Sequence, residues 1–478
     1  MTGQVKKIIA GVCVVAVLSA SLVLVKFLPS TKKSASGSSS GSSSSGISLA
    51  KNDAKKISYV QVTNSTGTYT VRKASDDKFT VDTLAGAPLN NTAVSGLVSA
   101  VATLSATQVV AENPSDIAQY GLDKPSATAV VGTTDNQTYT LKVGKSDPLG
   151  NGSYLQKEGD GNVYLVDSTV ANNLTQAAVS LVDKTLASVD SSKLAQLTKL
   201  HFAGQARTKA FVLDIDPSSV TASTSTSSES TPKYTISSPG SYMANDTNIS
   251  TLCSGLSALS ATSVAALNPT DAQLADYGLQ NPLYTTAFTY QGKETTLLFG
   301  KEYTDAENGQ MVYVMIKGNR VVYGLPTSSA TFYKWQLSDV TSNLLWTVNI
   351  DDVKSVDVAA GSKSWSFGLD GTGDNLKATI GSKTLSTDNF RQYYQTIMSF
   401  YQQGMADKPA NGALRLRITL NYRAANQKPK VLEFYTIDDY KAFYSIDSGG
   451  DFYVKQSDID HFIQVSQDMA DNKTVKAP

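Results

Sequence analysis

The chain of 478 residues has few of the side chains on which catalytic and metal sites are commonly built. It holds two cysteines and two histidines, His201 and His461. Cys13 lies in the first apolar stretch, so the remainder has one thiol, Cys253, and can form neither an internal disulfide nor a zinc site of paired cysteines. The neighbours of Cys253, STLCSGL, predict a small buried helix residue. No histidine stands at a metal-binding spacing. The sequence therefore predicts no metal, no cofactor and no catalytic residue, and a protein that is not an enzyme.

An excess of charge of either sign is also lacking. Lys+Arg and Asp+Glu number 41 each, and charged residues make up 17% of the chain. A nucleic-acid partner would require a basic face, so we expect none. Serine, threonine, asparagine and tyrosine are abundant instead, which is typical of an extracytoplasmic surface.

The N-terminus carries the one long apolar run, from Ile8 to Val25. Its length is near the lower limit for crossing a hydrocarbon core of about 30 Å. We predict an uncleaved transmembrane anchor within residues 1–29, with a cleaved signal peptide as the alternative. Basic groups balance on the two sides of the run, so their count does not orient it. The Ser/Gly-rich linker at 30–48 favours a tether that places the body on the extracytoplasmic side.

One sequence motif occurs twice, and we call it the repeated phrase. NPSDIAQYGLDKP begins at Asn113, and NPTDAQLADYGLQNP begins at Asn268. The likeness continues downstream, where YTLKVGK (139–145) matches TTLLFGK (295–301). A third, eroded copy lacks the phrase but keeps ADKP (406–409) and a similar hairpin at 442–462. Repetition at this spacing predicts duplicated domains, which we place at 49–190, 191–348 and 349–470, followed by a tail at 471–478.

The phrase predicts a short helix with both ends specified. The asparagine is a suitable N-cap and the proline a suitable first helical residue. The glycine fits the left-handed position after the helix, with the next leucine packing back as in a Schellman motif. A ligand-binding loop is the alternative. The residues assigned to this structural motif are Asn113, Pro114, Tyr120, Gly121, Leu122, Pro125, Asn268, Pro269, Tyr277, Gly278, Leu279 and Pro282.

The remainder of each unit alternates polar and apolar residues, as strands do. We predict an α+β fold: after the transmembrane helix, three tandem units, each with an opening hairpin, one main helix and an antiparallel β meander. The opening strands are ISYVQV (57–62), LTKLHF (197–202) and VKSVDV (353–358). The polar segment 217–232 is expected to be a disordered loop.

The chain resembles a known family. Tyr-Gly-Leu-x-x-Pro, a strand ending in Gly-Lys and a tyrosine-rich hairpin, behind one N-terminal apolar segment, resemble the bacterial envelope proteins labelled domain of unknown function 4340. The resemblance covers most of residues 57–346 and is weaker in the third unit. Members are often found beside ABC transport systems of the gliding-motility auxiliary type, so the resemblance implies an extracytoplasmic accessory role. It implies no catalytic residues.

Aromatic residues give the candidate binding sites. Stacked tyrosines on a sheet can hold a sugar or a peptide, whereas cross-strand packing in the core is the structural alternative. The third unit adds Arg391, Arg415, Arg417 and Arg423 and the aromatic helix NFRQYYQTIMSFYQQ (389–403), which predict a partner-binding surface, drift of the core being the alternative. The candidate binding tyrosines, aligned by sequence between the three units, are Tyr154, Tyr313 and Tyr444, and Tyr164, Tyr323 and Tyr453.

Two functions from different classes are compatible with these features of the sequence. The first is a non-enzymatic, membrane-anchored scaffold or accessory subunit of a cell-envelope complex, with a protein partner. The second is a module that binds cell-wall glycan or peptide. The sequence does not specify the partner or the oligomeric state.

Overall fold

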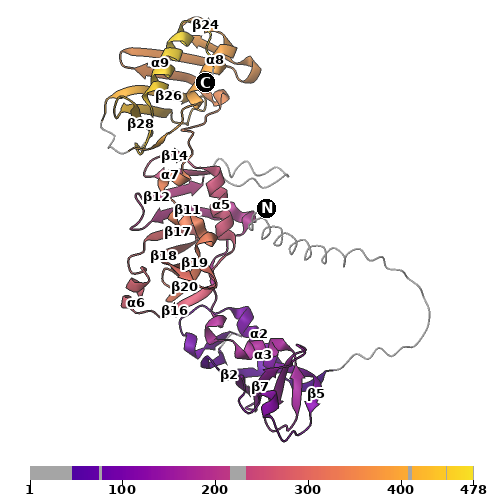
Figure 1. The fold of residues 1–478 in the computed structure, drawn as a ribbon. Coiled ribbons are helices and arrows are strands. Elements are labelled where there is room, and N and C mark those ends of the chain that lie inside the picture. The colour runs from indigo at the N-terminus through magenta and orange to yellow at the C-terminus, as the bar shows by residue number, and fades with distance from the viewer. Residues whose placement is uncertain (1–45, 75–77, 216–232, 407–411, 448, 477–478) are drawn as a thin grey trace, which may run out of the picture. The chain divides into compact units, whose positions relative to one another are not determined.

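The computed structural model describes residues 46–74, 78–215, 233–406, 412–447 and 449–476 (Figure 1). The predicted anchor at 1–29, nearly all of the linker at 30–48 and the polar segment 217–232 lie outside the described residues. Within the described residues, no helix is both long and apolar enough to cross a membrane. Residues Ser48–Pro478 form one compact unit.

The fold is mostly β, so the predicted α+β class with one main helix per unit is wrong. The described residues form three nine-stranded sheets and one two-stranded sheet, with antiparallel pairing. Strands lie about 4.8 Å apart, so nine of them span about 40 Å, whereas a helix with its side chains is about 10–12 Å across. One helix cannot cover such a face, and each large sheet is accompanied by more than one.

The first sheet belongs to the first domain. Helices α2 (Asn91–Ala102) and α3 (Ser168–Thr175) pack with it and with each other. The strand order is β1 (Ile47–Lys51), β5 (Thr103–Ala111), β9 (Val163–Val166), β8 (Ser153–Lys157), β7 (Thr138–Ser146), β6 (Ala127–Thr133), β2 (Ile57–Asn64), β3 (Gly67–Lys73) and β4 (Phe79–Val81).

The second domain has an equivalent sheet. It is accompanied by α5 (Asp246–Ser257), α6 (Asp271–Asp276), α7 (Leu337–Val340) and the 3-10 segment η7 (Thr327–Lys334). A separate two-stranded sheet pairs β10 (Thr185–Ala187) with β15 (Leu259–Ser260). The order of the large sheet is β14 (Tyr242–Met243), β13 (Tyr234–Ser238), β12 (Phe211–Ile215), β11 (Leu197–Ala203), β17 (Tyr284–Tyr290), β18 (Lys293–Asp305), β19 (Gly309–Ile316), β20 (Val321–Pro326) and β16 (Ser263–Leu267).

The third domain repeats the pattern with α8 (Thr387–Met398) and α9 (Gln456–Ala470), which pack on each other and on the sheet. Figure 1 shows both helices on one side of the strands. The strand order is β24 (Lys383–Leu385), β23 (Lys377–Ile380), β22 (Lys363–Asp370), β21 (Val353–Ala360), β26 (Leu414–Tyr422), β27 (Lys430–Thr436), β28 (Lys441–Ile446), β29 (Phe452–Lys455) and β25 (Gly404–Met405).

The three large sheets share one topology. In each, an opening meander pairs through its first strand with a closing meander of four strands, and a strand that precedes the closing meander in the chain pairs with its last member. The first sheet has β1 as an additional edge strand. The expected opening strands are present as β2, β11 and β21. The described part of the chain therefore contains three copies of one sheet domain.

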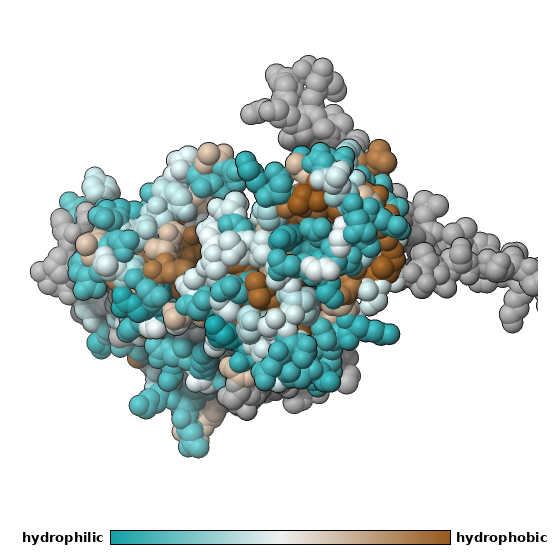
Figure 2. All heavy atoms as spheres, turned by 90° about the horizontal axis from the view of Figure 1, so that it is seen from below, coloured by the Kyte–Doolittle hydropathy of each residue, from teal (hydrophilic) through white to brown (hydrophobic). Residues whose placement is uncertain are grey.

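Alternation along the strands builds the main core. Val60 and Val62 of β2 and Leu97 of α2 are fully buried in the first domain. Trp346, which precedes the third domain in the chain, is also fully buried, and its indole N–H donates to the carbonyl of Ile397 of α8 at 3.0 Å. On the face seen in Figure 2, hydrophilic residues predominate and apolar residues show in limited patches.

Candidate functional site

The repeated phrase folds as a capped turn in both copies. In the second copy, Gly278 has φ 72°, the N–H of Leu279 donates to the carbonyl of Leu274 at 2.7 Å, and the N–H of Gly278 donates to that of Ala275 at 3.0 Å. These two hydrogen bonds define a Schellman motif. The first copy has the same pair, from Leu122 to Ile117 and from Gly121 to Ala118, around Gly121 at φ 70°.

The start of the phrase differs from the prediction. Asn113 and Asn268 are not N-caps: both adopt left-handed backbone angles, with φ 43° and 46°. The N-cap of α6 is Thr270, which exchanges hydrogen bonds with Gln273 in a capping box. Pro114 and Pro269 therefore precede the helical turn instead of beginning it. Asparagine is among the few residues that tolerate this region, so its role here is to turn the chain.

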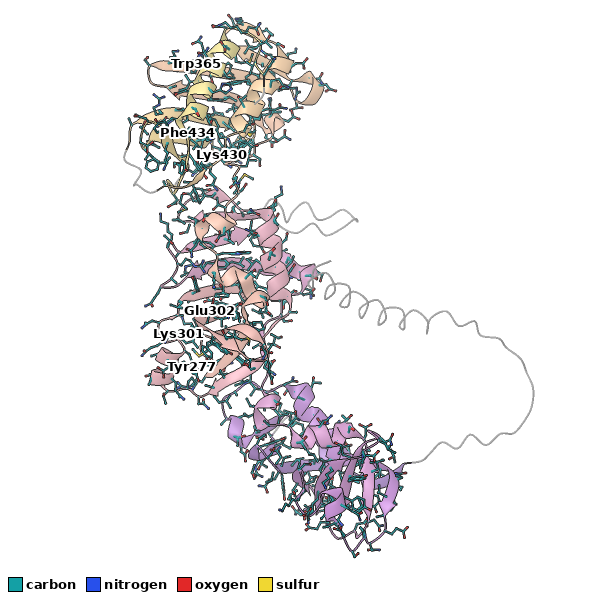
Figure 3. All side chains as sticks on the ribbon, in the orientation of Figure 1. Tyr277, Lys301, Glu302, Trp365, Lys430 and Phe434 are labelled. Atoms are coloured by element: carbon teal, nitrogen blue, oxygen red, sulfur yellow. The ribbon has the colours of Figure 1, made fainter. Side chains whose placement is uncertain are left out.

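The Tyr-Gly-Leu turn and the Gly-Lys strand end form a single contact. The N–H of Lys301 donates to the carbonyl of Tyr277 at 2.8 Å, and Figure 3 shows these two residues close together. A Cβ atom added to Gly300 would lie 2.1 Å from that carbonyl oxygen. In the first domain, a Cβ atom on Gly144 would lie 2.1 Å from the carbonyl oxygen of Tyr120. The glycine thus lets the turn approach the strand, where the pairing of β18 with β19 shifts register.

Tyrosine rings fix the turn on the side of the sheet away from the main core. The ring of Tyr277 lies 4.6 Å from that of Tyr313, which stacks on Tyr303 at 4.2 Å. Leu279 is buried there in a small cluster separate from the main core. In the first domain, the rings of Tyr120 and Tyr154 are 5.1 Å apart. We call each turn, with the Gly-Lys strand end and the tyrosine beneath it, the turn–strand lock.

The six candidate tyrosines do not form one repeated surface. Tyr164, Tyr323 and Tyr444 are buried, and Tyr154, Tyr313 and Tyr453 are half-buried. The predicted equivalence of the third copy is wrong by one residue. Tyr444 pairs with Phe434 of the core face, whereas Tyr313 lies on the other face beneath Tyr277. Because neighbouring strand residues point to opposite faces, a slip of one residue exchanges core for surface.

Most of the arginine and aromatic side chains singled out in the third domain contact other residues of that domain. Arg415 pairs with Asp460, Arg417 donates to Glu433 at 2.7 Å, and Arg423 donates to the carbonyl of Asp351 at 2.9 Å. Arg391 donates to the carbonyl of Gly373. The helix aromatics Phe390, Tyr393 and Tyr394 are buried. These contacts favour the core-drift alternative over the partner surface.

A buried carboxylate lies where the third domain lacks the phrase. Asp451, near the turn between β28 and β29, accepts from the hydroxyl of Tyr242 and pairs with Lys209. The N–H of Gly450 donates to the same hydroxyl at 3.1 Å. In the second domain, the corresponding turn contacts the phrase, since the N–H of Asn268 donates to the carbonyl of Arg320 at 2.8 Å. The Tyr242 hydroxyl and the Lys209 ammonium both contact this carboxylate, so we assign Asp451 a packing role.

The residues with potential for chemistry lie apart. His201 is in β11 and His461 in α9. Cys253 is buried in α5, as predicted, and burial raises the pKa of its thiol to about 11. Across the described residues, no group of three or more His, Cys, Asp or Glu side chains could hold a metal ion.

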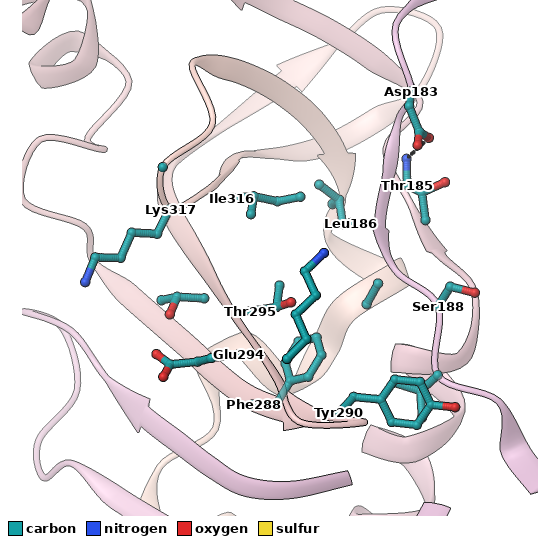
Figure 4. Close-up of a pocket in the computed structure, with 15 residues that line it drawn as sticks. Asp183, Thr185, Leu186, Ser188, Phe288, Tyr290, Glu294, Thr295, Ile316 and Lys317 are labelled. Atoms are coloured by element: carbon teal, nitrogen blue, oxygen red, sulfur yellow. Dashed lines mark hydrogen bonds between the residues drawn. The ribbon is translucent and has the colours of Figure 1, made fainter. Parts of the chain in front are cut away.

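A hollow of about 710 Å³ lies between the sheet of the second domain and the segment that contains β10. In Figure 4, Ile316 from the sheet and Leu186 from β10 face each other, with Thr295 and Phe288 beside them. Its volume falls in the range of about 300–1,000 Å³ typical of ligand sites. Apolar, hydroxyl and charged groups all contribute to its lining, represented by Leu186, Phe288, Ile316, Thr295, Lys293 and Glu294. No feature of the sequence predicted this hollow.

Comparison with known proteins gives a family and no function. No match was found among curated proteins or among solved structures. The family model described as domain of unknown function matches residues 80–232 and 235–411, in two tandem segments that together cover more than half of the chain. The chain therefore belongs to the family called domain of unknown function 4340.

Proposed function

We propose that the protein is a non-enzymatic accessory or scaffold subunit of a cell-envelope complex, linked to an ABC-type transport system. Its N-terminal apolar segment holds it at the membrane, and the three sheet domains stand on the extracytoplasmic side. The support for this placement is the apolar run from Ile8 to Val25, the Ser/Gly-rich linker and the family resemblance.

The use made of the repeated residues carries the proposal. Tyr277, Gly278 and Gly300 serve one turn–strand lock, and their counterparts serve the same lock in the first domain. The repeated residues pack a turn against a sheet and do not form a set of reactive groups. Their duplication therefore adds surface area and length to the molecule. Such duplication suits a protein that spaces or presents partners.

The proposal is tested by purifying the full chain from detergent-solubilised membranes after mild cross-linking in cells. Membrane-spanning and ATP-binding subunits of a transporter should co-purify in a constant ratio. Their absence from repeated preparations would contradict the accessory role.

A binding module for cell-wall peptide or glycan is the second candidate, favoured by the hollow beside β10. Retention of the full chain on purified cell wall, without transporter subunits, would select it.

A further inference from the structure

A smaller pocket lies in the third domain, between the C-terminal end of α8 and the first half of α9. Its volume is about 310 Å³, at the lower end of the range of about 300–1,000 Å³ that is typical of ligand sites. Phe400 and Phe462, both nearly fully buried, line it with rings that lie 5.4 Å apart. The ring of Phe400 also lies 4.7 Å from that of Phe434 in β27. The apolar base of the pocket is therefore held in place by the core.

One aromatic side chain at this pocket is exposed. Tyr401 lines the pocket and is 50% exposed, whereas the other aromatic residues of the segment 389–403 are buried. Its hydroxyl makes no hydrogen bond with the described residues. Tyr401 can therefore offer both its ring and its hydroxyl to a molecule outside the domain.

The exposed ring is particular to the third domain. In each domain the residue after the C-cap of the main helix is buried, and these residues are Leu104, Leu259 and Phe400. The next residue is exposed in each domain, and these residues are Ser105, Ser260 and Tyr401. The first two domains show that the fold needs no aromatic residue at this place. The tyrosine thus adds apolar surface beside the pocket that packing does not require.

The pocket also carries an unopposed negative charge. Asp458 of α9 is the only carboxylate among the lining residues, and none of them is a lysine or arginine. The Asp458 side chain is half-buried and accepts from the hydroxyl of its neighbour Ser457 at 3.4 Å. Lys455, the N-cap residue of α9, makes no ion pair with it. The charge of the lining therefore favours a cationic occupant.

The other polar groups of the pocket divide into used and unused ones. The hydroxyls of Thr396 and Ser399 each donate to a carbonyl of α8 itself at 2.6 Å. His461 is exposed and makes no hydrogen bond with the described residues. The rim therefore presents a phenol, a carboxylate and an imidazole above an apolar base. A few polar groups around an apolar base are typical of a site that fixes the orientation of its ligand.

We propose that this pocket binds an arginine side chain of a partner protein. The guanidinium group stacks on the ring of Tyr401 and donates to the carboxylate of Asp458. Its aliphatic stem covers the rings of Phe400 and Phe462. Arginine suits the site better than lysine because its planar head can stack on a ring and bond to a carboxylate at the same time. The proposal deepens the accessory role, and it rests on that role only for the source of the arginine.

The probe is the peptide acetyl-Ala-Arg-Ala-amide, whose binding to the full chain in mild detergent is followed by saturation-transfer NMR. The matched peptide, acetyl-Ala-citrulline-Ala-amide, has nearly the same shape and no charge. It should bind at least about fivefold more weakly, because hydrogen bonds between two charged groups are the stronger ones. Equal binding of the two peptides, or no binding of the arginine peptide, overturns the proposal.

Variants locate the binding in this pocket. Asp458→Asn keeps the size of the side chain, removes its charge and should weaken the arginine peptide at least about fivefold. Tyr401→Ser, which supplies the residue of the other two domains, should weaken it about two- to fivefold. The matched control is Asp388→Asn, which removes a carboxylate from the first turn of α8 outside the pocket and should leave binding unchanged. Circular dichroism melts verify that the variants are folded. An Asp458→Asn variant that binds as the unaltered chain does overturns the proposal.

A reversal of charge in cells tests the source of the arginine. Asp458→Arg should lower the yield of cross-linked transporter subunits at least about fivefold, because like charges then meet in the pocket, whereas Asp388→Arg should not. If the pocket binds the peptide and Asp458→Arg keeps its transporter subunits, the assignment to a partner protein is overturned. Transporter subunits still co-purify with the unaltered chain in each of these failures. They are therefore distinguishable from failure of the accessory role.

Discussion

At the scale of single residues, two glycines decide how the repeated phrase docks. Gly278 supplies a left-handed backbone angle, and Gly300 leaves room for the carbonyl of Tyr277. The first requirement could be predicted from the sequence, because a glycine before a leucine at the end of a helical phrase is typical of a Schellman motif. The second could not, since Gly300 and Tyr277 are brought together only by the fold.

Replacing glycine by alanine should have opposite effects on stability at Gly300, which lies in this contact, and at Gly96, which lies outside it. Gly300→Ala places a Cβ atom 2.1 Å from a backbone oxygen and should lower the free energy of unfolding by about 1–3 kcal/mol. Gly96→Ala, at an exposed position within α2 with nothing within 4 Å, should raise it by about 0.5–1 kcal/mol. Chemical denaturation measures both. Equal effects at the two sites would refute the close approach.

At the scale of elements, the turn–strand lock ties a short segment to the outer side of a sheet. Its stability should depend on the aromatic contact between the turn and β19, because the rings of Tyr277 and Tyr313 lie 4.6 Å apart. Aromatic pairs contribute about 0.5–1.5 kcal/mol beyond the area they bury.

A double-mutant cycle tests this contact. Tyr277→Ala and Tyr313→Ala should show a coupling free energy of about 0.5–1.5 kcal/mol in unfolding experiments. Tyr277→Ala combined with Tyr290→Ala is the control, since no ring contact joins those residues, and its effects should add. Additivity in the first cycle would mean that the turn docks through its backbone alone.

The sequence predicted elements better than their number or their register. Repetition and alternation located the opening strands β2, β11 and β21. Alternation did not show that nine strands join in each sheet, and this is why the fold class was wrong. In the third copy, sequence alignment matched Tyr444 to Tyr313, although pairing with Phe434 places it on the core face. The hollow could not be predicted either, because only the fold brings the segment that contains β10 against the sheet.

At the scale of the whole molecule, buried tyrosines make stability depend on pH. Burial raises the pKa of Tyr69 and of Tyr323 to about 12, and it raises the pKa of Tyr393 as well. The side chain of tyrosine in an unfolded chain has a pKa of about 10. A raised folded pKa contributes stability that is complete below the unfolded pKa and is lost as pH rises through the folded one.

We therefore predict that the free energy of unfolding falls between pH about 10 and about 12. Denaturant titrations at successive pH values measure the slope. Tyr69→Phe, which removes one titrating group and only a long hydrogen bond of 3.4 Å to the carbonyl of Gln176, should make the slope shallower. A stability that is constant across this window would contradict the burial of these rings.

Both proposed functions depend on a body that stands outside the membrane on a tether. The most direct test is protease treatment of intact cells stripped of their wall, followed by detection of the C-terminal part of the chain. The linker at 30–48 consists mostly of Ser, Gly and Lys, and we predict cleavage there with release of a fragment that contains the three sheet domains. A cytoplasmic protein in the same sample should stay intact as the control. Cleavage that occurs only after lysis would place the body inside the cell and contradict the account.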